Sequence, residues 1–179
     1  MANIEVQKLL EAGFIRECQY SEWILYVVLV RKPNGTLRMY VDFTDLNKAC
    51  LKDSCPLSKI DKLVDTMAGH TLLRFMDAFF EYHQIPLCLD NQEMTAFIMD
   101  WGLYCYKVMP FGLKDARATY QPLINKLFEL LISKTIEVHV DEMIVKSRKD
   151  VDHSHNLGKM FDILWAFRMK LNLKKCVFG

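Results

Sequence analysis

Several common features are missing from this chain of 179 residues. No apolar run approaches the ~20 residues that a helix needs to cross a bilayer. The N-terminal Met-Ala-Asn-Ile-Glu-Val-Gln-Lys has no apolar stretch behind a basic flank, so we expect no secretory signal. Internal repeats, low-complexity tracts and linkers are also lacking. These absences favour one continuous globular unit that stays inside the cell, in the cytoplasm or the nucleus, and has no contact with a membrane.

A surplus of one charge sign is missing too. The 23 Lys and Arg residues nearly balance the 22 Asp and Glu residues, giving a net charge of +1. This excludes a globally basic nucleic-acid binder, so any contact with nucleic acid must use local clusters. The candidates, each of which could equally be a solvated surface, are Arg31-Lys32, Lys146 to Lys149 and Lys170 to Lys175.

None of the six cysteines forms a Cys-x-x-Cys pair. Without a secretory signal they are expected to be reduced thiols in a reducing compartment. A zinc site made from Cys50, Cys55 and His70 is conceivable, but it lacks the paired close ligands of known zinc sites.

Hydrophobic spacing and turn residues predict interleaved helices and strands. Helices are expected at 4–12, 57–67, 114–131 and 151–168, and strands at 23–30, 37–43, 72–79, 95–99, 104–109, 136–145 (a hairpin) and 175–178. Hairpins outnumber regular βαβ units in this order. The sequence therefore predicts an α+β domain with a mostly antiparallel sheet and helices packed on one face.

Two acidic patches interrupt strand-like runs that otherwise favour burial. Asp77 lies in the run from Leu72 to Phe79, and the pair Asp141-Glu142 lies at the tip of the hairpin from Ile136 to Val145. Carboxylates that converge without basic partners are commonly held together by Mg²⁺, which points to phosphoryl or nucleotidyl transfer. The alternative for a single Asp near a strand end is a turn or cap residue, which is the commoner case.

The segment Lys107 to Lys114 places Pro110, Phe111 and Gly112 between a predicted strand and a predicted helix. Such a loop can bring its backbone close to a nucleotide. An ordinary strand-to-helix turn is the alternative, and spacing alone favours it.

Five segments taken together are more specific than any of these patterns. They are Leu37 to Asn47, Phe75 to Phe79 followed by Tyr82 to Ile85, Tyr104 to Leu113, Val138 to Met143, and Lys170 to Cys176. In order and spacing they resemble the reverse transcriptases of Ty3/gypsy LTR retrotransposons, particularly those of plants, over essentially the whole chain. The resemblance implies the fingers (approximately 1–70 and 91–115) and palm (approximately 71–90 and 116–179) of a right-hand polymerase. By the same resemblance, we expect no thumb, RNase H, protease or integrase segment within these residues.

The resemblance implies the active site of a two-metal polymerase, which works on an RNA or DNA template with a primer and dNTPs. Asp77, Asp141 and Glu142 match the ligands of two Mg²⁺ ions, for which Mn²⁺ can substitute. The remaining matches are Arg38 and, more weakly, Lys32 at the incoming triphosphate, Tyr82 under the deoxyribose, where it excludes a 2′-hydroxyl, Phe111 and Gly112 in the pocket wall, and His139 beside the primer end.

The chain departs from the family pattern at several of these positions. The usual Tyr-x-Asp-Asp reads His139-Val140-Asp141-Glu142, and a Glu side chain is about 1.5 Å longer than Asp, which matters for near-attack geometry. Phe80 and Glu81 replace a small residue and a Gly. We therefore expect a weak or inactive polymerase. A remnant that only binds nucleic acid is the alternative, while a metal-dependent nuclease would leave Tyr82 and Arg38 unexplained.

Overall fold

The computed structural model describes residues 2–31, 35, 37–51, 60–139 and 142–177, and these fold as two compact units. Unit 1 comprises Met1–Lys52 and Tyr82–Ala116, and unit 2 comprises Asp53–Glu81 and Arg117–Gly179. The sequence-based division placed 53–70 with the first part and 82–90 with the second. The described residues of these two stretches group with the other unit by their contacts, and the assignment of fingers and palm stays a prediction.

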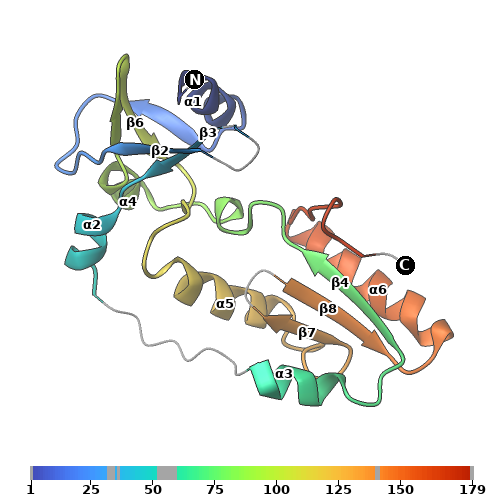
Figure 1. Ribbon diagram of the computed structural model, residues 1–179. Helices are drawn as coiled ribbons and strands as arrows, with labels where there is room; N and C mark the ends of the chain where they lie inside the picture. Colours follow the sequence, from blue (N-terminus) through green and yellow to red (C-terminus); the bar gives the residue numbers. More distant parts are fainter. Residues whose placement is uncertain (1, 32–34, 36, 52–59, 140–141, 178–179) are drawn as a thin grey trace. The chain divides into compact units, whose positions relative to one another are not determined.

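Unit 1 contains two small antiparallel sheets, one with strand order β1-β6-β5 and one made of β2 and β3 (Figure 1). Its elements are α1 (Ala2–Glu11), β1 (Ile15–Cys18), β2 (Val27–Arg31), β3 (Leu37–Val41), α2 (Thr44–Ala49), the 3-10 helix η1 (Glu81–Gln84, of which Glu81 belongs to unit 2), α4 (Leu89–Met94), β5 (Phe97–Met99) and β6 (Gly102–Tyr106). Apolar side chains from both sheets and from α1 and α2 form one core, which includes Ile15, Phe43, Leu46, Phe97 and Tyr106. This core holds α2 and the end of β6 in fixed places.

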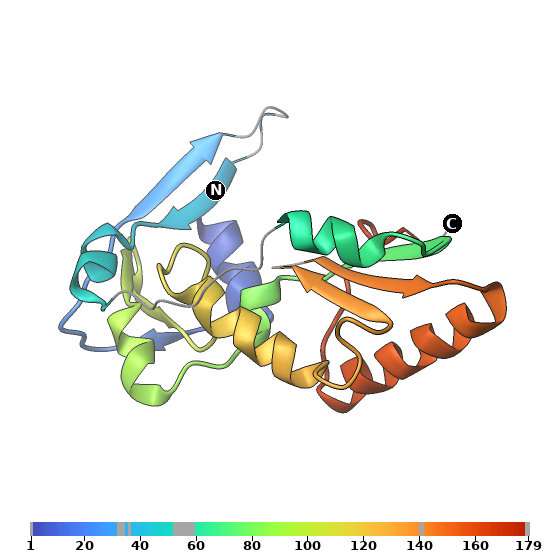
Figure 2. The same ribbon diagram turned by 90° about the horizontal axis from the view of Figure 1, so that it is seen from below.

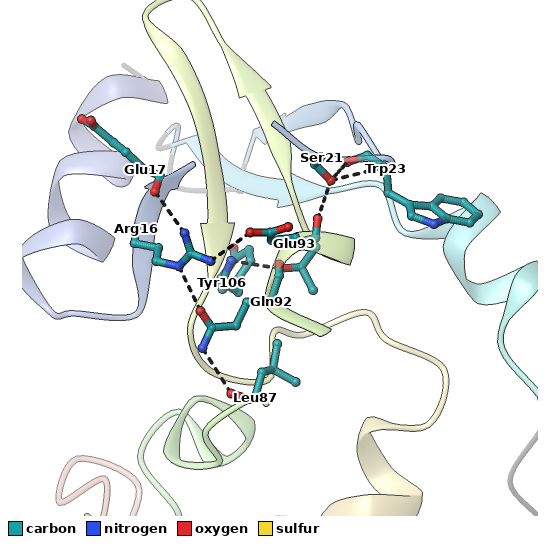
Figure 3. Close-up of polar contacts among 9 residues, drawn as sticks. Arg16, Glu17, Ser21, Trp23, Leu87, Gln92, Glu93 and Tyr106 are labelled. Atoms are coloured by element: carbon teal, nitrogen blue, oxygen red, sulfur yellow. Dashed lines mark hydrogen bonds and ion pairs between the residues drawn. The ribbon is translucent and has the colours of Figure 1, made fainter. Parts of the chain in front are cut away.

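A polar network ties β1 to the loop around α4 (Figure 3). Arg16 Nε donates to Gln92 Oε1 at 3.0 Å, and Gln92 Nε2 donates to the Leu87 carbonyl at 3.2 Å. The Arg16 guanidinium also lies 3.6 Å from a Glu93 carboxylate oxygen. Because Gln92 is buried, both ends of its amide need partners, and this network supplies them.

Unit 2 is built on one antiparallel sheet in which β8 lies between β4 and β7 (Figure 1). Its elements are α3 (Ile60–Met67), β4 (Leu72–Asp77), α5 (Ala116–Leu127, whose first residue belongs to unit 1), β7 (Ile136–His139), β8 (Glu142–Ser147) and α6 (Asp150–Ala166). Figure 2 shows α5 and α6 on one side of this sheet and α3 on the other.

Two neighbouring residues of β8 show how both faces are covered. Ser147 Oγ lies 2.9 Å from His153 Nδ1 and accepts a hydrogen bond from Asn156 Nδ2, so it faces α6. Lys146 points the opposite way, because successive side chains alternate along a strand, and its Nζ donates to the Thr66 carbonyl of α3 at 2.8 Å.

Lys146 also forms a buried ion pair with Glu137 of β7. The Nζ and Oε1 atoms are 2.6 Å apart, and the two side chains are only 2% and 9% exposed. The pair and the Thr66 carbonyl together satisfy a charge that would otherwise be costly to bury.

The segment after α6 covers the outer edge of β4. Asn172 N–H donates to the Asp77 carbonyl, Val177 N–H to the Phe75 carbonyl, and Phe79 N–H to the Lys170 carbonyl. This edge is therefore paired with backbone from the same chain, which keeps it from templating contacts with other chains.

Helix α6 ends at Ala166, and Arg168, two residues further on, has a left-handed backbone with φ of 54°. Met169 N–H donates to the Leu164 carbonyl and Arg168 N–H to the Trp165 carbonyl, a hydrogen-bond pattern that usually has glycine at the left-handed position. Replacing Arg168 with glycine is expected to raise the free energy of unfolding by roughly 0.5–1 kcal/mol, or about 2 °C in melting temperature. The check is thermal unfolding beside Arg168→Ala, which keeps the strain. Equal gains for both variants would contradict this account.

The α+β class and the antiparallel sheets expected from the sequence are confirmed, as are the hairpin of β2 and β3 and the acidic hairpin of β7 and β8. The first hairpin strand begins at Val27 rather than Trp23, and the described part of the helix expected at 57–67 begins at Ile60. The expected strand at 175–178 is wrong for its described part, where only Val177 bridges to Phe75. None of the helices in the described part of the chain is both long and apolar enough to cross a bilayer.

Candidate active site

Three predicted site residues, Asp77, Glu142 and His139, form a row across the sheet of unit 2. Asp77, the last residue of β4, is the register partner of Glu142, the first residue of β8. Glu142 is in turn the partner of His139, the last residue of β7. Register partners on antiparallel strands point to the same face, and their Cβ atoms lie about 4.5–5.5 Å apart. Two carboxylates and an imidazole therefore occupy register-paired positions on one face, at one end of the sheet.

This row lies on the sheet face opposite α6. Glu142 and Lys146 are separated by an even number of residues along β8, so their side chains share a face. Lys146 bonds to α3 and not to α6. The site thus lies on the face whose far end α3 covers.

The Asp77 carboxylate is held by a lysine that the sequence did not single out for this role. Lys175 Nζ lies 2.8 Å from Asp77 Oδ2, and the Asp77 side chain is 14% exposed while that of Lys175 is 63% exposed. The backbone bond from Asn172 to the Asp77 carbonyl brings the lysine into reach. Sequence analysis marked 170–175 as a basic cluster and 170–176 as a segment of the family resemblance. It gave Lys175 no partner, since nothing in the chain order links it to a residue 98 positions earlier.

The donor chemistry of the row fits Mg²⁺. Ionised carboxylates are the hard oxygen ligands that Mg²⁺ prefers, and two of them placed directly opposite each other repel unless a cation lies near. Asp141, the third expected ligand, lies outside the described residues. Within the described part of the chain, no group of three or more His, Cys, Asp or Glu side chains gathers as a metal site.

In unit 1, the predicted residues Tyr82 and Phe111 pack against each other. Their ring centroids are 5.0 Å apart at an interplanar angle of 70°. His83 lies behind them, with its ring 5.2 Å from that of Phe111 and 4.9 Å from that of Phe14. Tyr82 and His83 are buried, whereas Phe111 is 43% exposed. A half-exposed aromatic ring is thus backed by a buried aromatic group.

Burial lowers the pKa of His83 to about 4, so its ring is neutral near pH 7. The unfolded chain takes up a proton as the pH falls through 6.5, while the folded chain does so only near 4. The neutral His83 ring therefore contributes fully to the free energy of unfolding above pH 6.5. This contribution, up to roughly 3 kcal/mol, is lost as the pH falls from 6.5 to about 4.

We expect His83→Phe to remove this part of the pH dependence. Urea unfolding at about pH 7 and about pH 4.5 would measure it, because the carboxylates titrate equally in both chains and cancel in the difference. His155→Phe, at an exposed position of α6, is the matched control and should keep the parent slope. A parent-like slope in His83→Phe would contradict the burial of a neutral ring.

Gly112 follows Phe111 with φ of +102°, a conformation that side chains rarely adopt. A Cβ built at Gly112 would lie 3.2 Å from Cδ2 of Phe43, which is buried. The sequence left open whether this loop is an ordinary turn, and the geometry shows a position that requires glycine.

The other predicted residues are less fully described. Arg38 lies in β3 opposite Val30, but its side chain is outside the description, and Lys32 lies outside it altogether. Glu81 begins η1, directly after Phe80, which has φ of 47°. Because Arg38 and Tyr82 belong to unit 1 and Asp77 to unit 2, the expectation that they share one cleft stays a prediction.

Comparison with known families identifies the chain. Residues 30–179 match the family described as reverse transcriptase (RNA-dependent DNA polymerase), and the chain belongs to this family.

Its relatives include the retrovirus-related Pol polyprotein from transposon 297 of Drosophila melanogaster, 29% identical over 178 residues, and the transposon Tf2-3 polyprotein of Schizosaccharomyces pombe, 29% identical over 176 residues. These alignments cover 97% and 98% of this chain but only 17% and 13% of the relatives.

Solved structures show the same fold. The prototype foamy virus protease-reverse transcriptase matches with a TM-score of 0.86 and 23% identity, covering 97% of this chain and 23% of that one. The foamy viral enzyme in complex with an RNA/DNA hybrid matches with a TM-score of 0.87 and 22% identity, covering 96% of this chain and 23% of that one.

Proposed function

We propose that this chain is the polymerase part of a retrotransposon polyprotein, in which unit 1 forms the fingers and unit 2 the palm. The reaction would be attack of a primer 3′-hydroxyl on the α-phosphate of a dNTP, directed by an RNA or DNA template. The observation that supports it best is the pairing of Asp77 with Glu142 at the end of the unit 2 sheet, next to the predicted ligand Asp141 in sequence. The Ty3/gypsy subtype and the intracellular location stay predictions.

Asp77, Asp141 and Glu142 would hold two Mg²⁺ ions. Divalent ions at such a site lower the pKa of the attacking hydroxyl and neutralise charge on the leaving pyrophosphate. Lys175 holds the Asp77 carboxylate in the structure described and would have to release it to a metal ion.

The nucleotide would be oriented by side chains of unit 1. Arg38, with Lys32 as a weaker candidate, would bind the triphosphate through charge-assisted hydrogen bonds. Tyr82 would pack under the deoxyribose and exclude a 2′-hydroxyl, and Phe111 and Gly112 would line the pocket, where the half-exposed Phe111 ring already packs on Tyr82. On unit 2, His139 would lie beside the primer end.

Metal binding and primer extension together test this proposal. Electron paramagnetic resonance should detect Mn²⁺ bound to the parent chain and to Asp152→Asn, a control at an exposed position of α6, but not to Asp77→Asn. Extension of an oligo(dT) primer on poly(rA) should follow the same order, at low levels. Mn²⁺ binding that survives Asp77→Asn would overturn the assignment of the ligands.

A second function is favoured by two observations, namely Glu142 in the place of an Asp and Lys175 on Asp77. In this alternative the chain is an inactive remnant that binds nucleic acid through its basic clusters. Binding of an RNA/DNA hybrid without Mn²⁺ binding and without extension would select it.

A further inference from the structure

The loop that carries Phe111 is bridged by one side chain of α2. Asn47 Nδ2 donates to the Gly112 carbonyl at 2.8 Å, and Asn47 Oδ1 accepts from the Lys114 N–H at 2.7 Å. The amide thus uses its donor end and its acceptor end on two backbone groups of the same loop. Such a two-ended bridge fixes both the position and the direction of the backbone it holds.

Asn47 is itself held in place by its surroundings. Its neighbour Leu46 is buried in the unit 1 core, and the Asn47 N–H donates to the Phe43 carbonyl at 2.8 Å. Lys114 Nζ donates to the carbonyls of Asn47 and Cys50, at 3.3 and 3.2 Å, where a cation complements the C-terminal end of α2. A side chain of α2 thus bonds to the backbone of the loop, and a side chain of the loop bonds to the backbone at the end of α2.

The backbone conformation of the loop makes this bridge necessary. Glycine is the most flexible residue in the unfolded chain. Gly112 has no side chain that could hold its backbone in the conformation with φ of +102°. The preceding residue, Phe111, packs on Tyr82 and His83. A shift of the Gly112 carbonyl would move the Phe111 ring off these two partners.

We infer that Asn47 is a positioning residue, which keeps the Phe111 ring on Tyr82 by bridging the Gly112 carbonyl and the Lys114 N–H. This inference rests on the proposed function in one respect, since Tyr82 is there the residue that excludes a ribose 2′-hydroxyl. With the bridge removed, the Tyr82 ring loses its support and the choice of deoxyribonucleotides over ribonucleotides weakens. Asn47 touches no reacting atom in this role.

Two variants of Asn47 separate the halves of the bridge. Asn47→Asp keeps the acceptor for Lys114 N–H but has no N–H to donate to Gly112, and Asn47→Leu removes both at similar size. Asn91→Asp and Asn91→Leu are the matched controls, because Asn91 is exposed on α4 of the same unit. All variants are made in the full chain.

The first readouts need no activity. Hydrogen exchange of the Lys114 amide is expected to quicken about 10-fold in Asn47→Leu, the effect of losing one hydrogen bond, and to change little in Asn47→Asp. The Tyr106 amide, which donates to Thr95 Oγ1, should stay as in the parent. In both variants the nuclear Overhauser effect between the Tyr82 and Phe111 rings should weaken. An unchanged ring contact in Asn47→Leu would overturn the inference.

The second readout is the ratio of dTTP to UTP incorporation in primer extension. It is expected to fall about 10-fold in both Asn47 variants, mainly through KM, and to stay constant in the Asn91 controls. A lost ring contact with an unchanged ratio would overturn the link to sugar selection. A parent chain that incorporates no nucleotide would count against the proposed function alone, and the ring contact would still decide the role of Asn47.

Discussion

Replacing Lys146 with methionine is expected to lower the free energy of unfolding by roughly 3–5 kcal/mol. The substitution leaves the Glu137 carboxylate buried beside an apolar side chain, and it also leaves the Thr66 carbonyl without its donor. Because a domain of this size has only about 5–15 kcal/mol of stability, unit 2 would be left close to unfolding. Urea titration followed by circular dichroism measures the loss.

Two companion variants make this expectation specific to the ion pair. Lys134→Met, at an exposed turn of the same unit, should cost less than about 0.5 kcal/mol. The double variant Lys146→Met with Glu137→Leu removes both charges and should recover most of the loss, since apolar pairs of similar volume often replace buried ion pairs without cost. A double variant as unstable as Lys146→Met alone would show that packing, and not the unpaired charge, is responsible.

Restoring the family residues at two positions is expected to raise primer extension by about 10²-fold over the natural chain. The variant combines Glu81→Gly with Glu142→Asp. Glu142 faces Asp77 in the sheet, so its extra methylene pushes a carboxylate about 1.5 Å into the space that metal ions would share. Glu81 follows the strained residue Phe80 and adds a negative charge where a triphosphate is expected.

Extension on poly(rA) with Mg²⁺ and with Mn²⁺ measures the gain. Asp141→Asn added to the restored chain should return extension to background, and Glu129→Asp, at an exposed position in unit 2, should leave the natural chain unchanged. Extension by the natural chain equal to that of the restored chain would show that the two substitutions are not disabling. A complete lack of extension in both would also contradict the expected gain.

The helices and strands that could be predicted from the sequence were mostly those with long, periodic hydrophobic patterns. The helix over 151–168 and the acidic hairpin combine strong apolar spacing with clear turns, and the structure contains both. Sequence analysis did not predict β1, α2 and α4, each of at most six residues. In such short elements tertiary contacts outweigh local preference. Leu46, for example, is the only buried residue of α2, yet it fixes that helix to the core.

The positions of the candidate site could be predicted from the sequence where they depend on local order, and not where they depend on distant contacts. Asp77 and Glu142 could be marked because each carboxylate interrupts an apolar strand. The bridge from Asn47 to Gly112 and the ion pair between Lys175 and Asp77 join residues 65 and 98 positions apart. No periodicity in the chain signals such pairs, because only the folded backbone brings them together.

Each unit is completed only after the chain has returned to it, and this sets an order for folding on the ribosome. Unit 1 has all of its residues once Ala116 is made, whereas the first stretch of unit 2 must wait for a second stretch that begins at Arg117. Throughout that interval β4 has no β8 to pair with, although its Met76 is almost fully buried in the finished protein. A nascent chain paused near Ala116 is thus expected to combine a folded unit 1 with the unpaired strand β4, whose apolar side chains are exposed. Chaperones would bind such an exposed apolar strand.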